Sequence, residues 1–184
     1  MRLATTAARL TVDEYLALDG PPHTQLIDGV VVVNQPSRRH QLVMARCWRA
    51  LDDWCGGGPG RGQAYPPIDV RVSDVDNFAP DVCWIAAEHL PPGDDRLAGV
   101  PDLVVEVRSP STWRFDVGIK LQRYEKAGLR ELWLVDPIGG TILRFGRSTP
   151  AAGEFDVMEE LAADDGLTTS LLPGFSARVG DLLV

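Results

Sequence analysis

Residues 101–112 read PDLVVEVRSPST, and this stretch decides the fold. The apolar run from Leu103 to Val107 predicts a strand that is buried on both faces, as central strands of α/β sheets are. Glu106 lies near the end of that run. An unpaired carboxylate is costly to bury, so Glu106 requires a partner group, a proton or a metal ion.

The sequence on either side predicts further strands and helices around this central strand. Thr11 and Glu14 form a capping box for a helix over residues 12–18. Asp28-Gly29 is a preferred hairpin turn between two β-rich arms. The other predicted elements are a helix over 38–54 capped by Ser37, strands over 68–72, 78–85, 131–136 and 141–145, a helix over 116–127 ending at Gly128, edge strands over 155–158 and 167–169, and a terminal helix over 177–183. The order predicts one α/β domain over residues 1–184, with a sheet sandwiched by helices and an N-terminal helix and β-hairpin.

The composition limits the class of protein. The chain has 184 residues, is 45% hydrophobic and carries a net charge of −8, which argues against a strongly basic nucleic-acid coat. No apolar run approaches the ~20 residues needed to cross a bilayer, and the polar start predicts no signal peptide. Cys47, Cys55 and Cys83 have no metal-binding spacing, so we expect free thiols in a reducing cytoplasm.

A metal ion at Glu106 needs a second ligand from another part of the chain. Asp102 shares its face of the strand but lies too far along it, about 13 Å at ~3.3 Å per residue. Asp81, behind Pro80 at the start of the preceding strand, reaches Glu106 if the two strands pair. We therefore expect a hard cation held by Asp81, Glu106 and the backbone carbonyl of Val107, with water completing the shell.

Hydrolysis by a metal-activated water also needs a cationic side chain. Arg108 follows Glu106 on the same face, and it can stabilise negative charge but cannot act as a base. Lys120 is the alternative, since Asp116, Lys120 and Tyr124 form one stripe on the following helix. Ordinary structural roles are also open: a surface acid–base pair on the strand, a turn residue at position 81, or an exposed ion pair on the helix.

Several motifs together carry a family resemblance. They are Pro80-Asp81, the run over 101–112, the series Asp116, Lys120, Tyr124, Gly128, Glu131, Trp133 and Val135-Asp136-Pro137, and the shorter Leu26-Ile27-Asp28-Gly29, Ser37-x-x-His40-Gln41 and Leu172-Pro173-Gly174-Phe175-Ser176. In this combination the chain resembles the Uma2 family of restriction endonuclease-like proteins, within the PD-(D/E)XK nuclease superfamily. The resemblance covers nearly the whole chain.

The resemblance implies a restriction endonuclease-like core with a central mixed sheet flanked by helices. It also implies Mg²⁺-dependent hydrolysis of DNA phosphodiesters, with Mn²⁺ able to substitute. It assigns Asp81 and Glu106 as metal-binding acids. It implies that Lys120 orients water and stabilises the transition state, because Arg108 occupies the place where the signature carries lysine. We expect DNA to be the substrate and the chain to form a homodimer. We expect no membrane association.

Other positions match the family without an assigned role or depart from it. His40, Asp116 and Tyr124 coincide with frequently retained family positions. Gln25 stands where family members usually carry glutamate, and an amide cannot supply the negative charge that a second metal ion would need. Two alternatives therefore stay open. One is a nuclease fold that no longer cuts and serves as a nucleic-acid-binding or protein-interaction module, and the other is a metal hydrolase of small phosphoesters.

Overall fold

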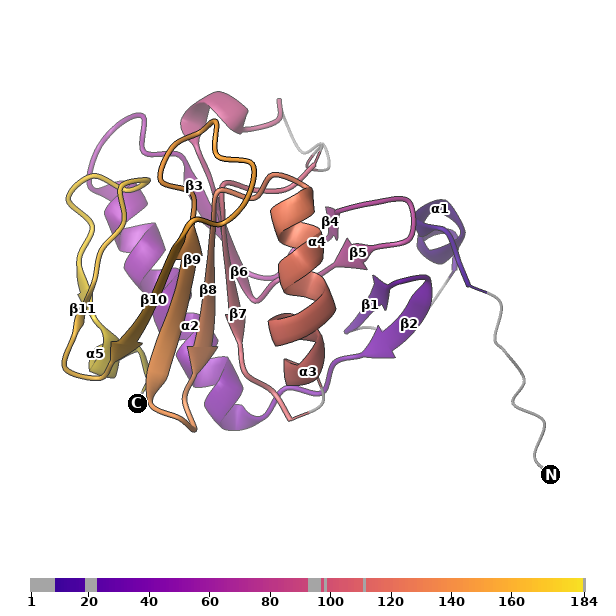
Figure 1. Cartoon of the computed structure of the whole chain (residues 1–184), viewed down its shortest axis with the longest axis horizontal. Helices are drawn as coiled ribbons and strands as arrows, with labels where there is room; N and C mark the ends of the chain where they lie inside the picture. Colours follow the sequence, from indigo (N-terminus) through magenta and orange to yellow (C-terminus); the bar gives the residue numbers. More distant parts are fainter. Residues whose placement is uncertain (1–8, 19–22, 93–96, 98, 111, 184) are drawn as a thin grey trace.

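A computed structural model describes residues 9–18, 23–92, 97, 99–110 and 112–183 (Figure 1). Its centre is a six-stranded sheet in the order β10-β9-β8-β7-β6-β3. The strand predicted from the opening stretch is β7 (Leu103–Val107), which pairs parallel with β8 (Glu131–Asp136) and antiparallel with β6 (Val82–Ile85). The outer strands are β9 (Thr141–Gly146), β10 (Val157–Ala162) and β3 (Gln63–Tyr65). The predicted mixed sheet of an α/β fold is confirmed.

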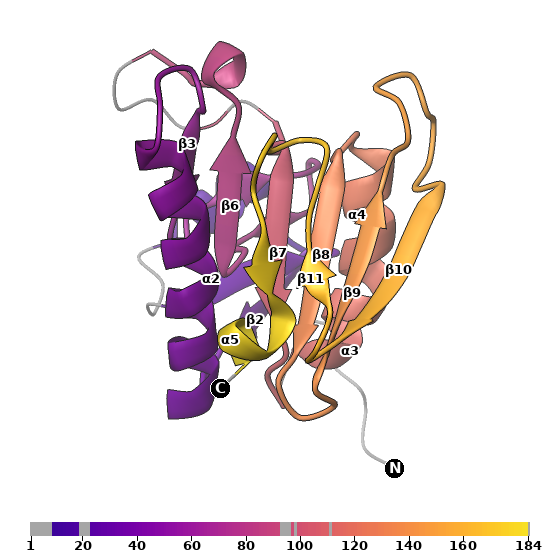
Figure 2. The same cartoon turned by 90° about the vertical axis from the view of Figure 1, so that its left-hand side faces the viewer.

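Helices cover both faces of this sheet (Figure 2). On one face lie α2 (Arg38–Gly56) and α5 (Val179–Leu183), and Val105 and Val107 of β7 point into the core beneath them. On the other face, α3 (Trp113–Phe115), η2 (Asp116–Lys120) and α4 (Leu121–Lys126) follow one another, and Val104 packs into a second core there. Alternate residues of β7 therefore face opposite helix layers, and Glu106 faces α4.

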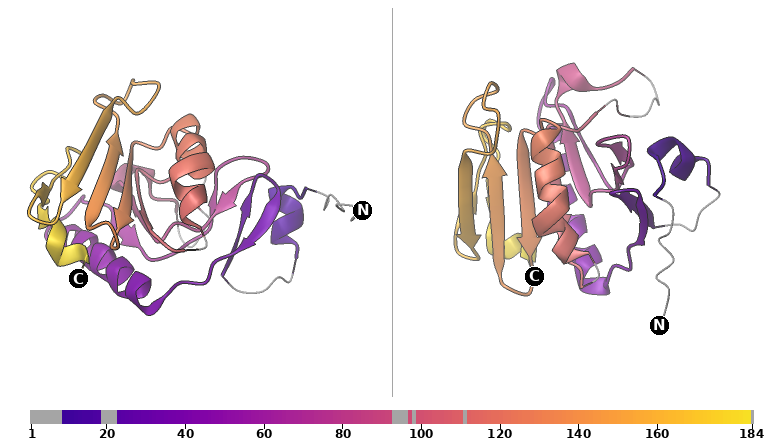
Figure 3. Two further views of the ribbon diagram at one scale, coloured as in Figure 1. Left: turned by 60° about the horizontal axis from the view of Figure 1, so that its bottom comes forward. Right: turned by 45° about the vertical axis from the view of Figure 1, so that its right-hand side comes forward.

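A smaller sheet extends the molecule beyond α4, on the side away from β10 (Figure 3). It has the order β2-β1-β5-β4, formed by β1 (Thr24–Ile27), β2 (Val30–Val33), β5 (Asn77–Phe78) and β4 (Val70–Arg71). The short α1 (Val12–Leu16) packs beside it. The remaining elements are η1 (Ala87–His89), β11 (Gly166–Leu167) and β12 (Ala177–Arg178). Within the described ranges, no helix has the length and apolar character required to cross a bilayer.

The local signals at helix and turn boundaries are confirmed. Thr11 and Glu14 form both hydrogen bonds of the capping box. The Ser37 side chain accepts from the backbone N–H of His40 at the start of α2. Asp28 and Gly29 join β1 to β2 with φ values of 51° and 74°, the left-handed conformation that a two-residue hairpin turn requires.

Some predicted elements are wrong in extent. The strand expected over 78–85 divides at Pro80 into β5 and β6, because proline has no N–H for the ladder. The strand expected over 68–72 forms only at Val70–Arg71. The helix expected over 116–127 begins with a π turn at Asp116–Lys120, where Gly118 leaves helical geometry at φ −117°, ψ −105°. Towards the C-terminus, β10 and β11 replace strands expected over 155–158 and 167–169, and residues 177–178 form β12 before α5.

Candidate active site

Asp81 lies at the junction between β5 and β6 and connects three elements. Its carboxylate atom Oδ2 accepts a hydrogen bond of 2.7 Å from the backbone N–H of Val107. The same oxygen lies 3.1 Å from Nε2 of His40, on the first turn of α2. Because a carboxylate oxygen only accepts, Nε2 of His40 carries the proton. The predicted pairing of β6 with β7 thus brings Asp81 to the end of β7, beside Glu106.

Glu106 is 3% exposed and binds two groups of the following helix. Its Oε1 lies 2.5 Å from Nζ of Lys120. The hydroxyl of Tyr124 donates to the same oxygen at 2.9 Å. The predicted stripe of Asp116, Lys120 and Tyr124 does face the end of β7, so the interpretation of these residues as an exposed helix pair is wrong.

The π turn holds a second carboxylate beside the same lysine. Oδ1 of Asp116 lies 3.0 Å from Nζ of Lys120, and both side chains are almost completely buried. Thr112 donates to Oδ2 of Asp116 at 3.3 Å, and its hydroxyl also contacts that of Ser109 at 2.7 Å. The end of the opening stretch therefore orients the acid that shares Lys120 with Glu106. π turns of this kind are often found at functional sites.

The cluster contains more buried acids than bases. Burial raises the pKa of Glu106 to about 8, with the charge of Lys120 opposing the rise and two neighbouring carboxylates adding to it. Burial likewise raises the pKa of Asp116, against the opposing effect of Lys120. Burial lowers the pKa of Lys120, but the two carboxylates beside it outweigh burial and hold the pKa above its ordinary value, so Lys120 remains protonated. Such a cluster retains a proton or attracts a further cation.

Gln25 and His40 are further buried polar residues beside Asp81. Both are 2% exposed, and both line a pocket of about 70 Å³ that also reaches Asp81. Burial lowers the pKa of His40, but the hydrogen bond and charge of Asp81 outweigh burial and raise it overall. Gln25, which the family resemblance places where glutamate is usual, therefore lines the pocket beside Asp81 with an amide.

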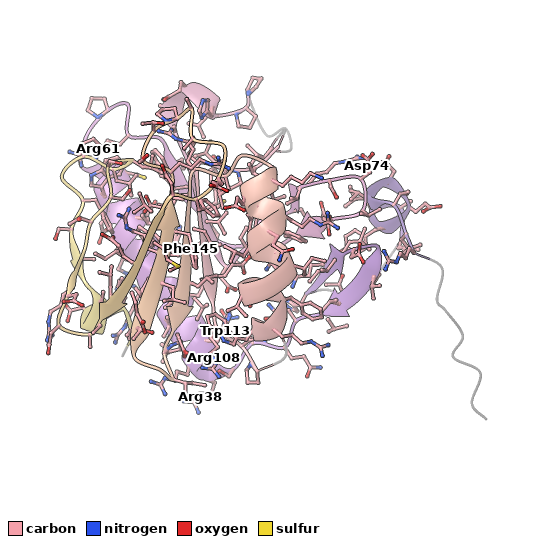
Figure 4. The ribbon with its side chains drawn as sticks, viewed as in Figure 1. Arg38, Arg61, Asp74, Arg108, Trp113 and Phe145 are labelled. Carbon is pink, nitrogen blue, oxygen red and sulfur yellow. The ribbon has the colours of Figure 1, made fainter. Side chains whose placement is uncertain are left out.

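Arg108 does not join the cluster in the part of the chain that the structure describes. Its guanidinium pairs with Asp136 at 2.5 Å. It also lies over the ring of Trp113, 5.5 Å from the ring centre; Figure 4 labels Arg108 and Trp113. The expectation that Arg108 joins Glu106 is wrong, because its side chain pairs with Asp136 at the end of β8 instead. Lys120 is the cation beside Glu106.

Sequence reasoning also missed Asn34. This residue directly follows β2 and lines the same pocket as Gln25. Its backbone N–H donates to the carbonyl of His23 at 2.8 Å, extending the hairpin beyond its last strand pair. A polar residue at the end of a run of four valines was the available signal, and it did not indicate which neighbours Asn34 would meet.

Protein groups supply only part of the coordination shell that a hard divalent cation needs. No group of three or more His, Cys, Asp or Glu side chains within the described ranges is arranged to hold a metal ion. Asp81 and Glu106 supply carboxylate oxygens, and the buried acids outnumber the one lysine among them. Mg²⁺ commonly binds through one or two carboxylates and retains several waters. The oxygen chemistry and the excess negative charge therefore suit such an ion, with Asp81, Glu106 and the carbonyl of Val107 as the groups that would hold it.

Comparisons with known proteins agree with this fold. A family model named Uma2, described as "Putative restriction endonuclease", matches residues 12–180. A crystal structure described as a putative nuclease belonging to DUF820, from Anabaena variabilis ATCC 29413, aligns with a TM-score of 0.80 at 18% sequence identity, covering 95% of this chain and 97% of that one. Among curated proteins, none matches the chain.

Proposed function

The chain belongs to the Uma2 family, and from that premise we propose that it is a metal-dependent DNA endonuclease. The observation that carries the proposal is the meeting of Asp81, Glu106, Asp116 and Lys120 at the end of β7. A buried set of acids around one lysine is costly to a fold, and such sets with strongly shifted pKa values concentrate at catalytic sites.

Asp81 and Glu106 are the proposed metal-binding acids, with the carbonyl of Val107 as the third protein oxygen. When bound, Mg²⁺ or Mn²⁺ lowers the pKa of a coordinated water and neutralises charge on the phosphate. His40 and the N–H of Val107 both bind Oδ2 of Asp81, and we assign the other carboxylate oxygen to the ion. Orientation of the ligand by such outer hydrogen bonds is common in metal sites.

Lys120 is the proposed stabiliser of the transition state. Because its neighbours keep it protonated, it donates hydrogen bonds and cannot accept a proton from water. Its ammonium group lies between Glu106 and Asp116, so it is held at the place where negative charge develops if Glu106 binds the ion. Tyr124 holds Glu106 from the same helix.

The family resemblance also supports a homodimer and DNA as the substrate. The free cysteines Cys47, Cys55 and Cys83 are consistent with a reducing cytoplasm. Sedimentation velocity of the purified chain tests the assembly: a single boundary at the mass of one chain, over a wide concentration range, would contradict the dimer.

A catalytically impaired module is the second candidate function. Two observations favour it: Gln25 supplies no charge, and Lys120 already pairs with both carboxylates in front of it. In this case the fold binds nucleic acid or a protein without cutting. Calorimetric titration with Mn²⁺ separates the two candidates, because the nuclease requires binding at millimolar metal or below and the impaired module does not.

The decisive experiment is a nicking assay on supercoiled plasmid with Mg²⁺ or Mn²⁺. The wild-type protein is expected to nick only with metal, and Glu106→Gln is expected to lose on the order of 10³-fold in rate. Glu160→Gln, an exposed change on β10, is the matched control and should retain full activity. Equal activity of wild type and Glu106→Gln would refute the assignment of Glu106, and metal-independent nicking would refute the role of the ion.

A further inference from the structure

A small polar pocket borders Asp81, and neither Glu106 nor Lys120 is among the described residues that line it. We call it the amide pocket and define it by Gln25, Asn34, His40 and Asp81, with Pro36 and Pro67 among its walls. Its volume is about 70 Å³. This is several times the space that one water needs, roughly 10–15 Å³ on the same measure. The pocket therefore has room for part of a ligand next to the candidate metal-binding acid.

Three polar atoms at this pocket have no hydrogen-bond partner among the residues that the structure describes. They are Oε1 of Gln25, Oδ1 of Asn34 and Nδ1 of His40. An unsatisfied buried polar atom costs about 1–3 kcal/mol, so a fold retains several together only where something else satisfies them. Two of the three atoms belong to Gln25 and His40, each of which is only 2% exposed.

The chemistry of the lining indicates what kind of group binds. The described residues that line the pocket include no Lys or Arg, and they do include the carboxylate of Asp81. A phosphate would therefore meet repulsion. The atoms of Gln25 and Asn34 without a partner are amide oxygens, which accept hydrogen bonds, and through such an oxygen Asn and Gln bind the amino group of adenine. The complementary ligand is neutral and carries N–H donors.

We infer that the amide pocket reads one nucleobase with an exocyclic amino group, which adenine, cytosine and guanine carry and thymine lacks, in the nucleotide next to the scissile phosphate. The inference rests on the proposed function, because that function supplies a nucleic acid at Asp81. The pocket admits the edge of a single base, so the base it reads is unstacked or single-stranded. Gln25, in the position of the usual family acid, is then a specificity-determining residue.

The test is binding of short fluorescent single-stranded homopolymers, followed by fluorescence anisotropy, with Ca²⁺ and again with EDTA. Oligo-adenine or oligo-cytosine is expected to bind about tenfold more tightly than oligo-thymine. If adenine is preferred, an oligomer of unsubstituted purine, which has hydrogen in place of the amino group, should lose the same factor. This comparison changes only the ligand, so it does not depend on the folding of a variant.

Gln25→Met should abolish the preference, so that oligo-adenine and oligo-cytosine bind no more tightly than oligo-thymine. Gln63→Met, an exposed glutamine on β3, is the matched control and should retain the preference. Equal affinity for all homopolymers, no binding to any of them, or a preference that survives Gln25→Met would overturn the inference. Nicking is scored separately: a protein that nicks plasmid without a base preference refutes only this inference, and one with the preference that never nicks refutes only the endonuclease.

Discussion

Asp102 and Glu106 lie on or beside the same strand, face the same side and are 4% and 3% exposed, but their surroundings differ in charge. Asp102 accepts from the backbone N–H of Ala86 at 2.8 Å and from Arg130 at 3.0 Å, and lies 2.9 Å from Nδ1 of His89. Every one of these partners can donate to it. Through these hydrogen bonds and ion pairs, Asp102 links η1 and the start of β8 to β7.

Glu106 has fewer donors and acidic neighbours. It shares Lys120 with Asp116, and the carboxylate of Asp81 adds to the negative charge around it. The fold therefore satisfies the acid at one end of β7 and leaves the acid at the other end short of positive charge. Structural carboxylates are surrounded by donors, whereas a carboxylate kept for chemistry is held where its charge is costly. The four predictions below test this contrast.

Removing the cation at each end of β7 should give the largest difference in unfolding free energy between the two ends. Lys120 is 1% exposed, and Lys120→Met leaves two buried carboxylates without a cation, at a cost of about 3–5 kcal/mol in unfolding free energy near pH 9. Arg130 is 33% exposed, and Arg130→Met should cost less than about 1 kcal/mol because His89 and Ala86 still serve Asp102. Urea unfolding measures both. Equal losses would contradict the contrast, as would a Lys120→Met protein that gains no stability towards pH 5.

The pH dependence of stability should come from the Glu106 end. The pKa of Glu106 is about 8 in the folded protein against an ordinary 4.5, so the folded state binds the proton more tightly. The stabilisation that this proton gives to the folded state is complete below about pH 4.5 and is lost as the pH rises through about 8. Asp116 and His40, whose pKa values are also raised, act in the same direction.

We expect the unfolding free energy of the metal-free protein to fall by on the order of 2–4 kcal/mol between about pH 5 and pH 9. Urea unfolding at several pH values gives the slope. Glu106→Gln should remove most of it, whereas Glu160→Gln should leave it unchanged. A slope that is identical in wild type and Glu106→Gln would show that another group is responsible.

Neutral isosteres at the two acids should change stability in opposite directions. Asp102→Asn should lower the unfolding free energy by about 1–3 kcal/mol, because Arg130 loses its charge partner and buried donors lose an acceptor. Glu106→Gln should raise it by about 1–2 kcal/mol near pH 9, because one of the crowded charges disappears. Chemical unfolding of both variants decides. The same sign for both changes would mean that Glu106 is structural in the way that Asp102 is.

The smallest effect is expected at the hydroxyl that supports Glu106. Tyr124→Phe removes the 2.9 Å hydrogen bond and keeps the ring, which packs edge to face on Phe78 at 5.2 Å. The cost should be about 1 kcal/mol, with a nicking rate reduced by a few-fold. Tyr65→Phe is the control. Tyr65 lies on β3, two strands from β7, and the change should alter neither the stability nor the nicking rate. An unchanged nicking rate in Tyr124→Phe would remove Tyr124 from the proposed machinery.

Much of the fold could be predicted because its signals are local. The capping box at Thr11, the turn at Asp28-Gly29 and the apolar run of β7 each depend on neighbours a few residues apart. The π turn at Asp116–Lys120 was not predicted from local signals, and within it Asp116 and Lys120 are buried and Lys120 pairs with Glu106 of another element. Tertiary contacts there outweigh the helical propensity of the segment.

The sequence by itself determined the α/β fold and the identity of the acids, lysine and tyrosine that meet at the end of β7. Periodicity and capping act within a few residues, and the family motifs are read directly along the chain. Only the tertiary structure decided that Arg108 pairs with Asp136, that His40 binds Asp81, and that Gln25 and Asn34 share a pocket. The physical reason is that charge balance and hydrogen-bond satisfaction depend on which distant groups pack together, and no short stretch of chain encodes that.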